Sequence, residues 1–284
     1  MKPTFDLLQP TRLDEALTYI GEKGVHLLAG GTALVRFMKA DEVAPVRLVS
    51  LHRLKEELGG IHAMDGGFSI GALATLTDIE QSPLVLSRAS VIVRTLRILA
   101  TPRVRNAATL GGHLAQAEPQ TDLPTILLSL GARIRVQSRS GERWMEIPDL
   151  FVATHRNSLS SGEIITEVHV PTQKRCAAYA KCTTISQSHD WPALGIAVNF
   201  DVLDGLLHDS RVALGAAIPH PVRLTSVEAI LDGQAPGPEL FARAGAEAAR
   251  TVAPFSDIRA SASYKKAVIP VYVRRALQSA LEGK

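Results

Sequence analysis

Two pairs of adjacent glycines place the strongest constraint on the fold of this chain. The first pair lies in Leu28-Ala29-Gly30-Gly31-Thr32 and the second in Thr109-Leu110-Gly111-Gly112-His113. Glycine has no Cβ, so backbone N–H groups in such a loop can approach an anionic group closely, and a following helix adds its positive N-terminal end. Two loops of the same design are suited to hold a diphosphate from both sides. Taken alone, either loop is better explained as a tight turn.

The composition is that of an ordinary globular protein. The 284 residues are 46% hydrophobic and 21% charged, which allows one large domain or two moderate ones with buried cores. The net charge is +3, and no run of lysine and arginine is interleaved with aromatics, so nucleic-acid binding is not indicated. No apolar stretch reaches the roughly 18 residues that span a membrane, and the N-terminus lacks the apolar core of a secretion signal. We therefore expect no membrane span and a cytoplasmic location.

The two cysteines, Cys176 and Cys182, restrict the redox chemistry available to this chain. Their spacing matches no metal-binding motif, and two thiolates cannot hold an iron–sulfur cluster that takes four. The sequence also contains neither the Rossmann nor the P-loop glycine motif. We therefore expect no metal site here, and any metal redox centre belongs to another chain.

Hydrophobic periodicity and turn residues predict mixed helices and strands before residue 172. The first glycine pair should lie between a buried strand at 25–29 and a helix at 33–40, an order that aims N–H groups at a ligand. A long helix at 86–100, capped by Thr77 or Ser82, should precede the second pair. The other expected elements are a helix from residue 13 to Gly21 or Gly24, a strand at 46–50, hairpins at 58–63/68–73 and 132–138/142–147, and a strand at 164–170.

The pattern changes after a linker at 171–175. Two long strands, at 195–203 and 206–216, are expected to form a hairpin, and helical periodicity dominates from Thr225 to the end. Pro270 should start or kink a helix, because proline lacks a backbone N–H. This part of the chain is therefore expected to be a separate α+β unit.

Polar residues around the second glycine pair each have more than one interpretation. Asp122 either caps the helix that follows it or accepts a hydrogen bond from a ligand hydroxyl. His113 either reaches a phosphate or makes a local structural bond. One of Arg103, Arg105 and Asn106 could contact a phosphate; the alternatives for each are a solvated side chain or one that pins its own loop.

Several motifs occur in the order and spacing of one family: Ala29-Gly30-Gly31-Thr32, Phe68-Ser69-Ile70-Gly71-Ala72, the segment 104–112, and Asp122-Leu123-Pro124. Over nearly its whole length the chain resembles the FAD-binding subunit of molybdenum hydroxylases, such as the medium subunit of aerobic carbon monoxide dehydrogenase and the flavin segment of xanthine dehydrogenase. The resemblance implies an α+β fold. A two-lobed FAD-binding domain of the vanillyl-alcohol-oxidase type would cover 1–172, with lobes that divide near residue 58, and a small α+β C-terminal domain would cover 176–284.

The resemblance also implies which residues bind FAD, and it assigns none of them a catalytic role. The two glycine loops would surround the diphosphate and ribityl chain, and Asp122 would bind flavin hydroxyls. Lys181 would stabilise negative charge on the reduced flavin, or is a surface lysine; Tyr179 would pack by the ring, or belongs to the core. Ile165 would make a backbone contact to the ring, and Leu99 a weaker apolar one. The full set is Leu28, Ala29, Gly30, Gly31, Thr32, Ala33, Leu34, Val35, Leu99, Thr109, Leu110, Gly111, Gly112, His113, Asp122, Ile165, Tyr179 and Lys181.

This sequence departs from the family pattern at three places. Ala33 replaces the usual Asp or Ser after the first glycine pair, and His113 replaces the usual Asn after the second. The arginines that often follow the lysine are replaced by Thr183, Thr184 and Ile185. These changes alter hydrogen bonds to the cofactor and the tuning of the flavin edge, but not the backbone loops.

The function implied by the resemblance is electron transfer. The chain would hold FAD and receive electrons from [2Fe-2S] clusters on a small subunit, after substrate is hydroxylated at a molybdenum cofactor on a large subunit. The assembly would be a dimer of heterotrimers. Two other classes stay open: a free-standing flavoenzyme of the same fold, and a scaffold subunit that has lost its flavin.

Overall fold

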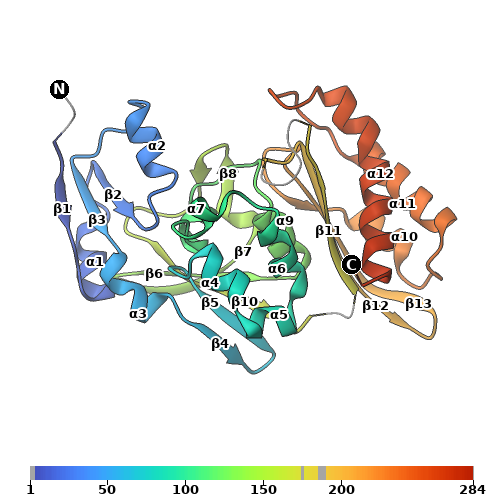
Figure 1. Cartoon of the computed structure of the whole chain (residues 1–284), viewed down its shortest axis with the longest axis horizontal. Helices are drawn as coiled ribbons and strands as arrows, with labels where there is room; N and C mark the ends of the chain where they lie inside the picture. The colour runs from blue at the N-terminus through green and yellow to red at the C-terminus, as the bar shows by residue number, and fades with distance from the viewer. Residues whose placement is uncertain (1–3, 174–175, 185–189, 284) are drawn as a thin grey trace.

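Three larger β-sheets follow one another along the length of the molecule (Figure 1). The computed structural model describes residues 4–173, 176–184 and 190–283. Helices and strands are mixed throughout, which confirms the expected α+β fold. Among the described residues, no helix combines the length and apolar character that crossing a membrane requires.

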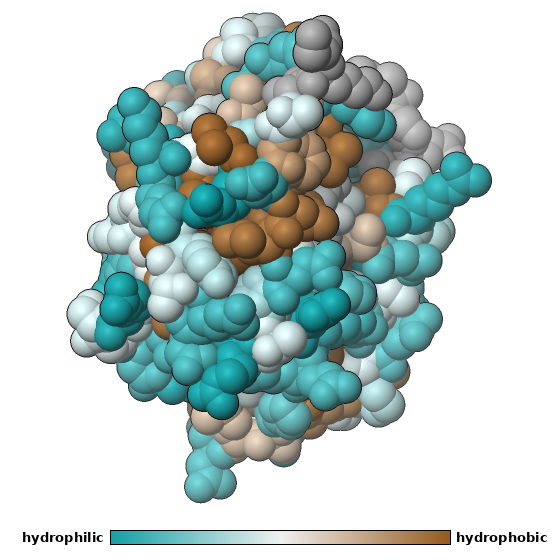
Figure 2. Space-filling model, turned by 90° about the vertical axis from the view of Figure 1, so that its left-hand side faces the viewer, coloured by the Kyte–Doolittle hydropathy of each residue, from teal (hydrophilic) through white to brown (hydrophobic). Residues whose placement is uncertain are grey.

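The first sheet contains three parallel strands in the order β1-β3-β2. Leu13, Leu17 and Val49 belong to its small core. Helix α2 has half-buried and exposed residues but none that is fully buried. Figure 2 views this end of the molecule and shows apolar residues gathered on an otherwise polar face. The elements are β1 (Asp6–Leu8), α1 (Leu13–Tyr19), β2 (Val25–Leu28), α2 (Leu34–Lys39), β3 (Arg47–Ser50), η1 (His52–Leu54) and α3 (Lys55–Leu58).

The second sheet contains five antiparallel strands in the order β4-β5-β10-β6-β7. Its strands and helices share the main core, which includes Phe68, Leu110 and Ile134. The strands are β4 (Ile61–Met64), β5 (Gly67–Gly71), β6 (Arg133–Ser138), β7 (Gly141–Glu146) and β10 (Ile164–Pro171). The helices are α4 (Leu76–Gln81), α5 (Pro83–Arg88), α6 (Ser90–Arg97), α7 (Pro102–Arg105), α8 (Leu110–Ala115) and α9 (Leu123–Ser129). A small hairpin follows β7 and comprises η2 (Pro148–Leu150), β8 (Phe151–Ala153) and β9 (Arg156–Asn157).

The third sheet is antiparallel in the order β11-β12-β13-β14, and helices α10 to α12 cover its outer face (Figure 1). Helix α9 packs on the opposite face, where a Cβ at Gly215 would lie 1.9 Å from Thr125 Oγ1. This close approach fixes the third sheet against the middle of the molecule. The elements are β11 (Cys176–Cys182), β12 (Leu194–Leu203), β13 (Leu206–Gly215), β14 (Val222–Arg223), α10 (Thr225–Leu231), α11 (Pro238–Thr251) and α12 (Ala262–Leu281).

Most expected strands and hairpins are confirmed, whereas one helix prediction is wrong and one of the two roles expected for Pro270 is not observed. The single helix expected at 86–100 is two helices, because Ala89 adopts non-helical angles (φ −152°, ψ 60°) between α5 and α6. Pro270 starts no helix but lies inside α12, packed against Gly245 of α11. Helix α4 was not expected, although Thr75 and Asp78 form a capping box at its start. Of the expected linker, residues 174 and 175 lie outside the described residues.

Candidate functional site

The two glycine loops lie against each other although they are far apart in the sequence. A Cβ built on Gly30 would lie 1.8 Å from the carbonyl oxygen of Ala107 and 3.0 Å from Ala108 Cα. A Cβ on Gly112 would lie 3.8 Å from the Cβ of Ala29. The fold therefore brings together the two loops that the sequence singled out, and Gly30 is the residue that allows their backbones to touch.

Within each pair, one glycine packs closely against the backbone of another segment, and the other meets only side chains, at 3.0 Å or more. Gly30 packs on Ala107 as described, and a Cβ on Gly111 would lie 2.7 Å from the Cβ of Ala72. By contrast, Gly31 meets only the side chains of Leu28 and Val35, and it adopts φ +71°, which favours glycine. Gly112 is exposed and meets only Thr109 Oγ1 at close range. Gly31 and Gly112 are therefore the glycines that leave room for a ligand.

Backbone donors are available at the first loop. Among the described residues, no hydrogen bond is donated by the amide N–H groups of residues 30–34. The first backbone hydrogen bond of α2 is donated by Val35 N–H to the Gly31 carbonyl. At the second loop, Thr109 Oγ1 accepts a bond from Gly112 N–H at 3.3 Å and caps α8. Ala33 is the N-cap residue of α2 and supplies no side-chain bond. The first loop thus presents a run of unpaired donors, as a phosphate site requires.

A pocket of about 720 Å³ opens at the first loop. This volume is typical of sites for small organic ligands. Six lining residues were predicted: Leu28, Ala29, Gly30, Gly31, Thr32 and Val35. Four were not, namely Arg36, Lys39, Ser50 and His52. Arg36 and Lys39 lie three positions apart in α2 and so share one face of the helix, a signal that would have found the two cations. Their charge suits an anionic ligand.

His113 carries an unpaired polar atom at the second loop. Its Nε2 is buried and has no hydrogen-bond partner among the described residues. Burial lowers the pKa of the imidazole to about 4, so the ring is neutral at pH 7. The local structural bond considered from the sequence is therefore not formed at Nε2. A buried, unpaired nitrogen is costly unless a ligand or water pairs with it.

Asp122, Tyr179 and Lys181 form one buried cluster. The Tyr179 hydroxyl donates to Asp122 Oδ1 at 2.7 Å, and Lys181 Nζ lies 3.2 Å from Asp122 Oδ2. Lys181 Nζ also donates to the Ile98 carbonyl at 3.3 Å. Because Asp122 precedes α9 and the other two lie on β11, the cluster joins the middle of the molecule to the third sheet.

This cluster corrects two alternatives drawn from the sequence. The helix-capping role of Asp122 is wrong, since its side chain caps nothing in α9 and is used instead by Tyr179 and Lys181. The surface-lysine interpretation is also wrong, because the side chain of Lys181 is only 5% exposed. Burial raises the pKa of the Asp122 carboxyl and the nearby Lys181 charge opposes this, while burial and the Asp122 charge raise the pKa of Tyr179. A charged group buried in this way is weakly screened by solvent, so it interacts more strongly with nearby charges.

Leu99 and Ile165 are both buried in the main core. Leu99 directly follows Ile98, whose carbonyl accepts a hydrogen bond from Lys181. Ile165 lies on β10, next to a bulge in the pairing with β6. Of the residues that replace the family's arginines, Thr183 and Thr184 follow β11, whereas Ile185 lies outside the described residues.

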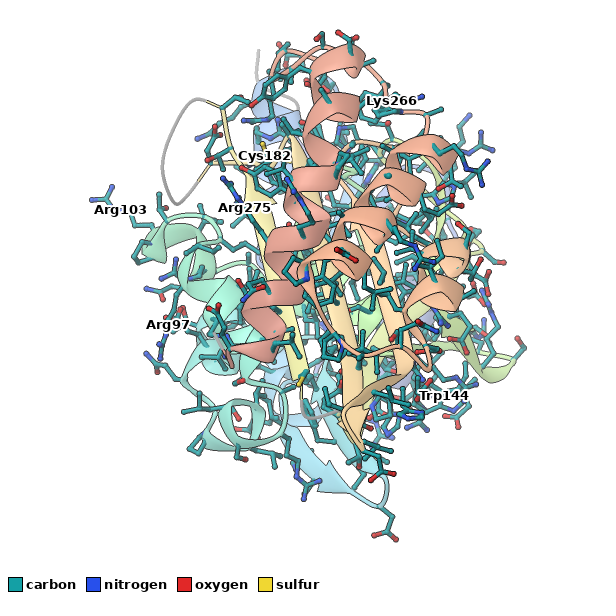
Figure 3. All side chains as sticks on the ribbon, turned by 90° about the vertical axis from the view of Figure 1, so that its right-hand side faces the viewer. Arg97, Arg103, Trp144, Cys182, Lys266 and Arg275 are labelled. Atoms are coloured by element: carbon teal, nitrogen blue, oxygen red, sulfur yellow. The ribbon has the colours of Figure 1, made fainter. Side chains whose placement is uncertain are left out.

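Arg105 pins its own loop, which confirms one of its interpretations. Its guanidinium lies 2.8 Å from Glu80 Oε2 and donates to the carbonyls of Leu99 and Ala100 at 3.1 and 2.7 Å. Asn106 accepts a bond from the Thr77 hydroxyl at 2.6 Å. Arg103 is exposed and points away from the body of the molecule (Figure 3).

Comparison with known proteins gives two family matches that together span most of the chain. Residues 3–173 match the FAD binding domain in molybdopterin dehydrogenase, and residues 178–280 match the CO dehydrogenase flavoprotein C-terminal domain.

Individual relatives are similar over almost their whole length. The carbon monoxide dehydrogenase medium chain of Hydrogenophaga pseudoflava is 29% identical, over 98% of this chain and 97% of that one. The nicotine 6-hydroxylase medium subunit of Paenarthrobacter nicotinovorans is 28% identical, over 98% of both chains. A chain of quinoline 2-oxidoreductase from Pseudomonas putida 86 superposes with a TM-score of 0.94 at 25% identity, covering 100% of this chain and 99% of that one.

Proposed function

Because this chain belongs to the family of FAD-binding domains in molybdopterin dehydrogenases, we propose that it is the FAD-binding electron-transfer subunit of a multisubunit molybdenum hydroxylase. One observation carries the proposal: the two glycine loops meet, and the first of them lines a pocket with two cations, Arg36 and Lys39. The two loops, so arranged, form the cradle inferred for a diphosphate.

The residues of the site fit FAD along its length. The free amides of residues 30–34 would hold the diphosphate, and Arg36 and Lys39 would add positive charge beside it. The unpaired Nε2 of His113 provides one further polar contact. The cluster of Asp122, Tyr179 and Lys181 would lie at the flavin end, as the resemblance implies.

Bound FAD supplies the redox chemistry, and the protein supplies position and electrostatics. Lys181 is buried, and its ammonium would favour negative charge on a flavin ring bound beside it. Asp122 fixes that ammonium through its second oxygen and receives the Tyr179 hydroxyl on the first. Electrons would arrive from iron–sulfur clusters on a partner and leave to an external acceptor.

The separate cores support the division of the chain into domains. We propose that residues 1–172 form the FAD-binding domain, with lobes that divide near residue 58, and that residues 176–284 form the C-terminal domain. Leu13 and Val49 belong to a core distinct from that of Phe68, and the third sheet has its own core with Phe200 and Leu277.

We further propose a cytoplasmic complex with a large subunit that carries the molybdenum cofactor and a small one with [2Fe-2S] clusters, assembled as a dimer of heterotrimers. The relatives that are named medium chains or subunits support the presence of partners. Purification of the untagged complex from its host, followed by mass measurement and metal analysis, tests the assembly. A flavin-bound monomer without companions would instead support a free-standing flavoenzyme.

Colour is the direct test of the cofactor. The purified chain should contain about one FAD per polypeptide, seen in its flavin absorbance and released on denaturation. A colourless chain that takes up no added FAD would support the flavin-less scaffold and refute the proposed function.

A further inference from the structure

We infer that Arg105 is a positioning residue for the flavin end of the site, where it holds the loop that seats Lys181. The inference rests on the proposed function, because it takes Lys181 to lie beside the flavin. Arg105 itself touches neither Lys181 nor the glycine loops through any contact that the described residues show. It acts through the loop at residues 98–101, which joins α6 to α7.

The first step is the way in which Arg105 fixes this loop. The Arg105 side chain is buried, and its Nε lies 2.8 Å from Glu80 Oε2 on α4. Its Nη1 donates to two successive carbonyls, those of Leu99 and Ala100. Ala100 adopts φ +51°, which is unfavourable for a residue with a Cβ and persists only where the surroundings impose it. Three bonds from one guanidinium supply that constraint.

The second step connects the loop to the charge. Ile98 directly precedes the two carbonyls that Arg105 holds, and the Ile98 carbonyl accepts a bond from Lys181 Nζ at 3.3 Å. Lys181 has a second bond, to Asp122, and its side chain is almost fully buried. A shift of the loop would therefore move one of the two acceptors that hold the ammonium in place.

The third step is that the same segment also supports the diphosphate end. Immediately after Arg105, Asn106 is tied to Thr77, and the Ala107 carbonyl is the atom against which Gly30 packs. The Ala108 carbonyl accepts a backbone bond from Leu76 at 2.9 Å. One short stretch of chain thus sets the position of the loop under Lys181 relative to the first glycine loop.

The chain offers a matched control on the same helix. Arg103 also lies on α7, but it is exposed and points into solvent (Figure 3). Arg105→Lys keeps the positive charge beside Glu80 and removes the planar fork that reaches the two carbonyls. Arg103→Lys makes the same chemical change where no loop is held.

The test measures the flavin reduction potential of the purified holoprotein together with its thermal stability. Arg105→Lys should still bind FAD, with a lower reduction potential than wild type, because the ammonium of Lys181 is less firmly held beside the ring. Arg103→Lys should leave both quantities unchanged. In a chain that already carries Lys181→Met, adding Arg105→Lys should produce no further shift of the potential.

Two results would overturn the inference. If Arg105→Lys lowers thermal stability and leaves the potential at the wild-type value, the residue has a structural role only. If its shift is the same in the Lys181→Met background, it does not act through Lys181. If Arg105→Lys fails to fold, Glu80→Gln takes its place, because it removes the ionic partner of Arg105 while keeping an acceptor for Nε. The flavin reduction potential and the thermal stability of Glu80→Gln then test the inference in the same way. A wild-type chain without FAD would refute the proposed function itself, which is a separate and earlier observation.

Discussion

Adding one methyl group to either glycine of the second loop should separate ligand binding from folding. Gly112→Ala places a Cβ 3.0 Å from Thr109 Oγ1 and touches little else. Within a helix, alanine is favoured over glycine by about 1 kcal/mol, which offsets this tight contact. The free energy of unfolding of the flavin-free chain should therefore stay within about 1 kcal/mol of wild type.

The same methyl should weaken FAD binding, because it lies on the open side of the cradle. Loss of one hydrogen bond to a charged group costs about 1.5–3 kcal/mol, which corresponds to about 10- to 100-fold in the dissociation constant. Gly111→Ala is the matched control. Its Cβ would lie 2.7 Å from the Cβ of Ala72 and 3.1 Å from the Ala72 carbonyl, neither of which can rotate away. Overpacking of this kind costs about 1–3 kcal/mol of stability.

The assay has two parts for each variant. Urea unfolding of the flavin-free chain gives the stability, and quenching of flavin fluorescence on titration with FAD gives the affinity. The reasoning is refuted if Gly112→Ala binds FAD as tightly as wild type while its stability is unchanged. It is equally refuted if Gly111→Ala is the more stable of the two flavin-free variants.

Three further predictions follow from the charges of the site. Asp122→Ala should destabilise the flavin-free chain by about 3–5 kcal/mol in urea unfolding, because it leaves the buried Lys181 ammonium without its carboxylate. The double variant Asp122→Ala/Lys181→Met should regain part of this lost stability. Lys181→Met alone should still bind FAD, and a redox titration should show a lower flavin reduction potential than in wild type. Since the pKa of His113 is about 4 in the folded chain against 6.5 normally, the unfolded chain binds the proton more readily, so the free energy of unfolding should fall by at most about 3 kcal/mol as the pH drops from about 6.5 to 4. His113→Asn should lack that part of the pH dependence, and an unchanged pH profile would contradict the assignment. Arg36→Ala and Lys39→Ala should each weaken FAD binding about fivefold, less at high salt, in the same fluorescence titration.

The features readable from sequence were those that depend on local chemistry. The glycine pairs were informative because glycine allows a close backbone approach that other residues do not. The hairpins were predictable because turn residues and the alternation of apolar residues are recognised within a few positions. Strand β11 was missed: its run Cys176–Cys182 contains three alanines, and small residues give weak alternation. Asp122 looked like a helix cap because nothing near it in sequence indicates Tyr179 and Lys181, which return on a strand of another sheet.

The conformation of Ala100 and the role of Arg105 also could not be predicted from the sequence. A guanidinium that holds two carbonyls five and six residues earlier leaves no periodic trace in the sequence. The basic residues of the pocket, Arg36 and Lys39, lie three positions apart in the helix that the sequence predicted at 33–40, so their common face could have been predicted as well.

The buried pair of Asp122 and Lys181 has a consequence for how proteins of this kind can be recombined. A chimera made by joining the first 173 residues of this chain to the C-terminal part of a relative would inherit one charge from each parent. If the second parent lacked a lysine at the corresponding position, the hybrid would carry a desolvated carboxylate with only the Tyr179 equivalent to satisfy it. With such a parent, a productive crossover has to lie outside the interval between residues 122 and 181, so that both members of the pair come from the same chain.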